Sequence, residues 1–84
     1  MKLPKRIKVV EKRLGREKAA GIVYPDDHDT LHIDPTLCAA DRLEILLHEG
    51  QHLLMPSAPE MKIRAWSRRL AAMLLSDGWR RIHK

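Results

Sequence analysis

Two histidines near the middle of the chain have the spacing of a metal site. His48 and His52 enclose Glu49 in the segment HEGQH, which follows the pattern H-E-x-x-H. Residues four apart on a helix lie one turn apart on the same face, so both imidazoles can reach one ion. Neutral imidazole is a good ligand for zinc, and zinc lowers the pKa of a water molecule that it binds. Because Glu49 lies beside His48, we expect its carboxylate to act as the general base in hydrolysis of a peptide bond.

A catalytic zinc ion usually has three protein ligands, and Glu60 is the best candidate for the third. It follows His52 by eight residues, and Pro56 lies between them. Proline ends a helix, so the chain can turn back at this point. A second interpretation stays open, because Ser57 and Glu60 also have the spacing of a capping box, in which the glutamate bonds to the helix start.

Five further side chains could ligate a metal, and each has a simpler explanation. An aspartate two turns before His48 is about 10 Å away along the helix axis, which is too far for direct ligation. An unaccompanied cysteine is more often a small buried residue than a ligand. This aspartate is Asp41 and this cysteine is Cys38. Of the other three, His28 is expected in a solvated turn, His32 on a strand and Asp77 at a helix end.

The N-terminal third of the chain predicts strands. Apolar residues alternate loosely over residues 6–14, form a short run at 20–24 and alternate again at 30–34. These patterns are typical of strands. Residues 25–29 have the turn-forming sequence PDDHD, because aspartate bonds to its own backbone and proline fixes φ. We expect a small antiparallel meander in which His32 points off the apolar side of its strand.

The middle of the chain predicts a helix over residues 39–55, ended by Pro56. With steps of about 100° per residue, a broad apolar face lies opposite the side that carries His48, Glu49 and His52. Ile45 lies on the same side as the histidines. We expect the apolar face to dock on the sheet and the histidine face to stay free for chemistry. The apolar face comprises Leu43, Leu46, Leu47, Gly50, Leu53 and Leu54.

A second helix is expected after Pro59, which suits a first helical turn. Its apolar residues recur at helical spacing through Leu75, and Asp77-Gly78 is a stop signal. These apolar residues are Ile63, Trp66, Leu70, Met73 and Leu74. The predicted fold class is therefore α+β, with a three-stranded antiparallel sheet followed by two helices in a single domain over residues 1–84. A chain of this size buries one small core.

Composition limits the classes of partner. The chain has 84 residues, a net charge of +5 and only 4% aromatic residues. Binding of single-stranded nucleic acid needs flat side chains for stacking, so we do not expect it, and we interpret the C-terminal arginines as a solvated helix face. One cysteine forms no intramolecular disulfide, which favours a cytoplasmic location. No apolar run approaches the ~20 residues of a membrane span, so no membrane partner is expected.

The segment LLHEGQH at residues 46–52 resembles the active-site helix of the zincin metallopeptidases. Residues 31–80 are similar to small, often phage-associated or bacterial metallopeptidase-like proteins, and more distantly to SprT-like and ImmA/IrrE-type peptidases. Their pattern is a strand ending in I-D-P, the motif helix, a proline, a glutamate that opens a final helix, and a G-Y/W-R ending. The matching positions here are Ile33-Asp34-Pro35, residues 46–52, Pro56, Glu60 and Gly78-Trp79-Arg80.

The resemblance implies a minimal gluzincin-like site, in which zinc is held by His48, His52 and Glu60 and Glu49 is the general base. It also implies that the strand at residues 30–33 forms the rim of a cleft, where an extended peptide or protein substrate pairs with it. The chain departs from the family in three ways. It has no third histidine of the metzincin type, Gln51 replaces an apolar residue, and residues 53–82 contain no tyrosine or histidine to stabilise an oxyanion.

Two other functions compete with a zinc peptidase. Zinc can also supply folding free energy to a small domain without catalysis. Alternatively, the net positive charge suits a basic module that binds an acidic partner or nucleic acid. Glu49 distinguishes the first two, because a structural zinc site has no need of a free carboxylate beside the ion. The substrate, the oligomeric state and the activity of the isolated chain stay open.

Overall fold

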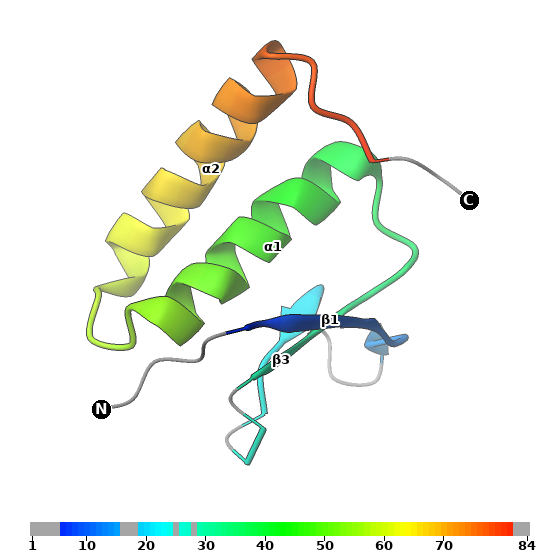
Figure 1. Ribbon diagram of the computed structural model, residues 1–84, viewed down its shortest axis with the longest axis vertical. Coiled ribbons are helices and arrows are strands. Elements are labelled where there is room, and N and C mark those ends of the chain that lie inside the picture. Colours follow the sequence, from blue (N-terminus) through cyan, green and yellow to red (C-terminus); the bar gives the residue numbers. More distant parts are fainter. Residues whose placement is uncertain (1–5, 16–18, 25, 28, 82–84) are drawn as a thin grey trace.

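The computed structural model describes residues 6–15, 19–24, 26–27 and 29–81 as three strands followed by two helices (Figure 1). The sequence-predicted order and the α+β class are confirmed. His28 lies outside the described residues. The elements are β1 (Lys8–Glu11), β2 (Gly21–Ile22), β3 (Thr30–Ile33), α1 (Ala39–Leu54) and α2 (Glu60–Ser76).

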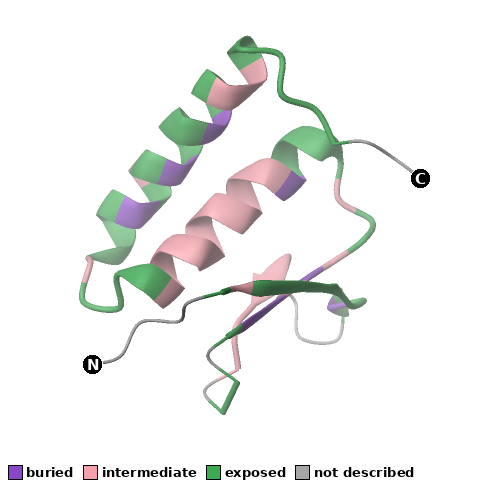
Figure 2. Ribbon diagram, in the orientation of Figure 1, coloured by how far each residue is buried: buried purple, intermediate pink, exposed green. Residues whose placement is uncertain are grey.

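Helix α1 lies between the sheet and α2 (Figure 1). It contacts β2, β3 and α2, while α2 contacts none of the strands in the described part of the chain. Buried residues lie on β3 and on the side of α2 that faces α1 (Figure 2). The fully or nearly fully buried apolar residues are Leu14, Leu31, Ile33, Ile63 and Ala71. No helix in the described residues is long and apolar enough to cross a bilayer.

The sheet is mixed, so the prediction of a purely antiparallel meander is wrong. The strand order is β1-β3-β2, with β1 parallel and β2 antiparallel to the central strand β3. In the register, Val9 lies opposite Leu31 and Gly21 lies opposite Ile33. Because β3 has a neighbour on both sides, the expectation that residues 30–33 form the open rim of a cleft is also wrong.

The connection between β1 and β2 explains this pairing. It spans residues 12–20, longer than the two to five residues of a usual hairpin loop, and it passes the C-terminal end of β3. There Lys12 N–H donates to Ile33 O at 2.9 Å, and Asp34 N–H donates to Ala20 O at 2.9 Å. Leu14 is buried, and its N–H donates to Asp34 Oδ2 at 3.0 Å. Lys12 and Ala20 therefore lie on opposite edges of β3, at its C-terminal end.

The side of α1 that faces the sheet differs from the prediction. A Cβ built at Gly21 on β2 would lie 2.6 Å from Ile45 Cγ2 and 3.2 Å from Glu49 Cγ. The side of α1 with Ile45 and Glu49 therefore packs on β2. Leu43 and Leu46, which were expected on the sheet, instead line an open groove beside β1. Only glycine allows this close approach of strand and helix.

The buried face of α2 consists of one isoleucine and two small residues, while its tryptophan and a methionine stay exposed. Its buried positions are Ile63, Ser67 and Ala71. Trp66 is 37% exposed and Met73 is 57% exposed, so the apolar spacing predicts the helix but only part of its buried face. The predicted stop is confirmed, because Gly78 has a φ of 91° and its N–H donates to Leu75 O at 3.1 Å. Positive φ favours glycine at a helix end.

Candidate metal centre

Three predicted ligands converge where α1 ends and α2 begins. His48 and His52 are one turn apart on α1, and their Nε2 atoms are separated by 3.1 Å. Glu60, the first residue of α2, lies against both. Its Oε1 is 2.9 Å from His48 Nε2, and its Oε2 is 2.7 Å from His52 Nε2. One ligand atom from each residue lies within 4.8 Å of the others, so the three can hold one metal ion.

The separations fit a zinc site. Zinc bonds of about 2.0–2.1 Å in a tetrahedral site place neighbouring ligand atoms about 3.3 Å apart. The observed contacts of 2.7 to 3.1 Å are about 0.2 to 0.6 Å shorter, and the two contacts of Glu60 use different carboxylate oxygens. Two imidazoles and a carboxylate are also a ligand set that zinc uses in catalytic sites, where the fourth position stays open. These residues therefore fit zinc in number and type, and they lie close enough together to hold one ion.

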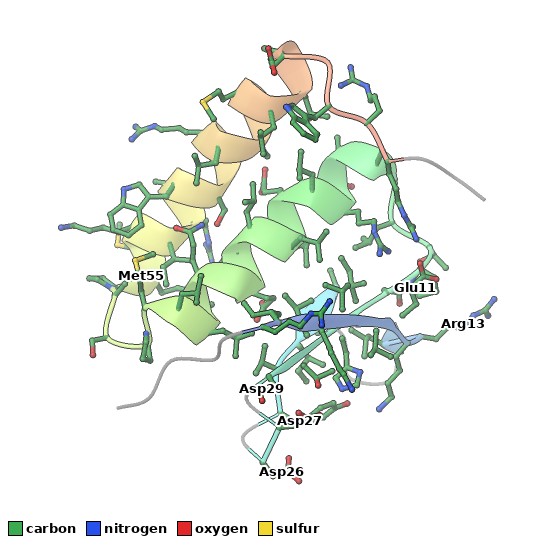
Figure 3. The ribbon with its side chains drawn as sticks, in the orientation of Figure 1. Glu11, Arg13, Asp26, Asp27, Asp29 and Met55 are labelled. Atoms are coloured by element: carbon green, nitrogen blue, oxygen red, sulfur yellow. The ribbon has the colours of Figure 1, made fainter. Side chains whose placement is uncertain are left out.

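The short connection between the helices brings Glu60 to the histidines. Residues 55–59 turn the chain, with Met55 N–H bonded to Gln51 O at 2.7 Å and Ala58 N–H bonded to Met55 O at 3.0 Å. Figure 3 labels Met55 at this end of α1. The cap of α2 is Pro59, and no side chain bonds to the helix start. The capping-box alternative is therefore not what the structure has, because the Glu60 carboxylate contacts both histidines instead.

Glu49 is half-buried between α1 and β2. Burial raises the pKa of its carboxyl group above the ordinary value. The positive charges of His48 and His52 oppose this rise, and the negative charge of Glu60 adds to it. All three predicted ligands are thus close enough to act on Glu49 electrostatically. A raised pKa makes the Glu49 carboxylate a stronger base than an ordinary glutamate.

Two residues near the centre were missed in the sequence. Gly21 lies on β2, and its contact with Glu49 joins segments 28 residues apart, so no local pattern indicates it. Arg64 Nη2 lies 3.7 Å from Glu60 Oε1. The i, i+4 spacing of Glu60 and Arg64 is a usual ion-pair pattern on a helix and was the available signal.

The other possible ligands lie apart from the centre or have other partners. Asp41 is exposed, and Cys38 is exposed rather than buried as expected. Asp77 Oδ2 accepts a hydrogen bond from Trp79 Nε1 at 3.1 Å. His32 packs edge-on against Tyr24, with ring centroids 5.0 Å apart. Its strand neighbours Leu31 and Ile33 are buried on the opposite face, so the predicted direction of His32 is confirmed.

Comparison of the chain with protein-family models, curated proteins and solved structures found no match. The resemblance to zincins therefore stays a prediction from the motif and its surroundings.

Proposed function

We propose that this chain is a zinc-dependent metallopeptidase of minimal size. His48, His52 and Glu60 hold the zinc ion, and Glu49 is the general base. The observation that carries the proposal is the convergence of three candidate ligand side chains from two helices, with contacts of 2.7 to 3.1 Å, beside a second, half-buried carboxylate, that of Glu49. A site built only for stability needs no such carboxylate.

The chemistry follows from these positions. When bound, zinc activates a water molecule as a nucleophile and polarises the substrate carbonyl. Glu49 accepts the proton that the attacking water loses and delivers it to the leaving amine. Burial against β2 supports this role, because a raised pKa lets the carboxylate both take up and release the proton. Arg64 lies beside Glu60 and balances part of its charge.

The substrate of the proposed enzyme is a peptide or protein segment. Among the described residues, β2 has β3 as its only strand neighbour, and its glycine lies against Glu49. The outer edge of β2 is therefore the strand edge nearest the general base. An extended peptide can add to such an edge through main-chain hydrogen bonds.

Two variants on α1 test the proposal. Glu49→Gln keeps the shape of the side chain but removes the base, so we expect it to retain zinc and to lose cleavage by about 10²-fold or more. Zinc content is measured by elemental analysis after dialysis, and cleavage with a fluorogenic peptide library. Glu44→Gln is the matched control, because it makes the same change on the same helix outside the site.

The results separate the proposal from its competitors. Unchanged cleavage in Glu49→Gln overturns the assigned role of Glu49. Stoichiometric zinc without cleavage of any library peptide by the unaltered chain identifies a structural zinc site instead. Full retention of zinc in His48→Ala and in His52→Ala sinks the metal centre itself.

A further inference from the structure

An open apolar groove lies on the flank of α1 away from the histidines. It has a volume of about 340 Å³ and runs between β1, the N-terminal half of α1 and the end of α2. The C-terminal segment descends from α2 to the start of α1 on this side (Figure 1). Apolar side chains form most of the wall: Val9, Leu43, Leu46, Leu75 and Trp79. Trp79 is 62% exposed, and Val9 is 48% exposed.

Three arginines complete the groove, and one of them lacks a full set of partners. Arg42, Arg80 and Arg81 line it. Arg42 is buried, and its Nη1 makes no hydrogen bond within the described residues, although Glu11 Oε1 is 3.4 Å away. A buried guanidinium nitrogen without a hydrogen bond costs free energy, and a carboxylate removes that cost.

Glu11 shows that carboxylates bind at this place. Its Oε1 accepts a hydrogen bond from Arg81 Nη2 at 2.7 Å, and this bond lowers the pKa of Glu11. Figure 3 shows Glu11 at the end of β1, below the C-terminal segment. Glu11 pairs with Arg42 and Arg81, whereas Arg80 Nη1 donates to the backbone oxygens of Leu75 and Trp79, so the three arginines that line the groove exceed this one carboxylate by two positive charges. The groove therefore favours a second acidic group from outside the chain.

Among the described residues, β1 beside the groove has β3 as its only strand neighbour, so its other edge is open. Lys8 N–H donates to Asp29 O at 2.7 Å and Lys12 N–H donates to Ile33 O at 2.9 Å, so the even-numbered residues bond toward β3. In a parallel ladder alternate residues bond to a given neighbour, so the backbone groups of Val9 and Glu11 point to the open edge. All four residues of β1 are exposed. Such an edge is a template for another strand.

We propose that the β1 edge and the groove together bind an extended segment of a partner protein with the pattern apolar-x-acidic. Alternate side chains of a strand point to the same face. A segment paired with β1 thus places two side chains, two residues apart, on the helix side of the sheet. The apolar one fills the groove beside Val9 and Trp79, and the acidic one joins Arg42 and Arg81.

Charge and size favour this occupant over others. A second copy of the chain carries the same net charge of +5 and brings the same arginines to the contact, which disfavours self-pairing. An oligonucleotide has phosphates for the arginines but no aliphatic group for the leucine wall. The groove volume is near the lower end for small-molecule sites, which span about 300–1,000 Å³, and suits one or two side chains.

A designed peptide tests the inference with the full chain. The probe is an acetylated and amidated heptapeptide, TLTETLT, whose threonines favour an extended backbone. We follow amide and indole shifts of ¹⁵N-labelled protein and expect saturable changes at Val9, Glu11, Leu43 and Trp79, with His48 unaffected. We expect at least about tenfold weaker binding for TLTQTLT, for TSTETST and for a probe with alternate N-methylated amides.

Trp79→Ala tests the groove from the protein side. The tryptophan is mostly exposed, so the fold survives its removal, and we expect about tenfold weaker binding. Trp66→Ala is the matched control, since Trp66 is exposed on α2 and does not line the groove; it should bind the probe as the unaltered chain does. Two results overturn the inference: no saturable shift with TLTETLT up to about 1 mM, or equal binding of TLTETLT and TLTQTLT. Competition by an eight-nucleotide oligothymidylate that binds more tightly identifies a general polyanion site instead.

Discussion

Two glycines near Glu49 have opposite surroundings. Gly50 follows Glu49 in the sequence, and a Cβ built there meets no neighbouring atom within 4 Å. Gly21 approaches Glu49 from β2, and a Cβ there would lie 2.6 Å from Ile45 Cγ2. Gly50 therefore only lowers the stability of α1, whereas Gly21 allows β2 to pack closely on α1.

The same substitution should therefore have opposite effects at the two positions. Gly50→Ala should stabilise the chain by about 1 kcal/mol, because alanine loses less backbone entropy in a helix. Gly21→Ala should destabilise it by about 1–3 kcal/mol, because the added methyl group overpacks the contact with Ile45. Urea unfolding followed by circular dichroism measures both. Equal effects of the two variants would contradict the close approach of β2 to α1.

At the scale of elements, one buried polar contact sets how the two helices lie together. Ser67 is fully buried, and its Oγ donates to Ile63 O at 2.7 Å. Gln51 Nε2 donates to Ser67 Oγ at 2.8 Å and to Leu47 O at 3.0 Å. Gln51 lies inside the H-E-x-x-H motif, so this contact fixes α2 against the turn of α1 that carries the histidines.

Removal of the serine hydroxyl should leave the Gln51 amide short of a partner. Ser67→Ala is expected to lower the free energy of unfolding by about 1–3 kcal/mol. In the double variant Gln51→Leu/Ser67→Ala the unpaired group is gone, so the two effects should be non-additive by about 0.5–3 kcal/mol. A double-mutant cycle in urea gives this coupling. Strict additivity would show that the two side chains do not interact.

Asp34 bonds to both Leu14 and Ala20, which lie in the connection between β1 and β2. Its carboxyl group should make the stability of the fold depend on pH. Hydrogen bonds from the side chain and backbone of Thr36 and from Leu14 N–H lower the pKa of Asp34 from 3.8 to about 2. A lowered folded-state pKa means that its stabilisation is present above about pH 4 and is lost as the pH falls toward 2. Unfolding of metal-free protein should show this loss, and Asp34→Asn should flatten it. Parallel curves for the two proteins would contradict the assignment.

The element scale also shows what the sequence could predict. Local signals gave the order of the elements, and α1 was placed within one residue of its observed end. The clustering of His48, His52 and Glu60 followed from the spacing of the two histidines and from the break at Pro56, and metal ligation by these residues stays a prediction. Strand pairing was wrong because it depends on Leu14 and Asp34, which meet across 20 residues. The predicted docking side of α1 was wrong, because the spacing of the leucines does not specify which neighbouring element they contact. Here Leu43 and Leu46 line a groove.

At the scale of the whole molecule, metal binding should act on stability. The proposed ligands come from two helices, and only the folded chain brings them together. Zinc at a hundredfold excess over its Kd should therefore add about 2.7 kcal/mol to the free energy of unfolding. In a domain of this size that corresponds to an increase in Tm of roughly 10–20 °C. Scanning calorimetry with zinc and with a chelator measures the difference, and Glu60→Gln should reduce it. An equal increase in His48→Ala would show that zinc acts elsewhere.

The close spacing of the ligands along the chain has a consequence for the order of assembly. His48, His52 and Glu60 lie within 13 consecutive residues, so a single helical hairpin contains the complete proposed metal-binding set. Closure of such a short segment takes well under a microsecond, whereas the contact of β2 with Glu49 must join distant parts of the chain. A nascent hairpin is thus competent to capture metal before the sheet forms. On the proposed function, Glu49 would acquire its buried setting later, so metal uptake would precede the capacity for catalysis during maturation.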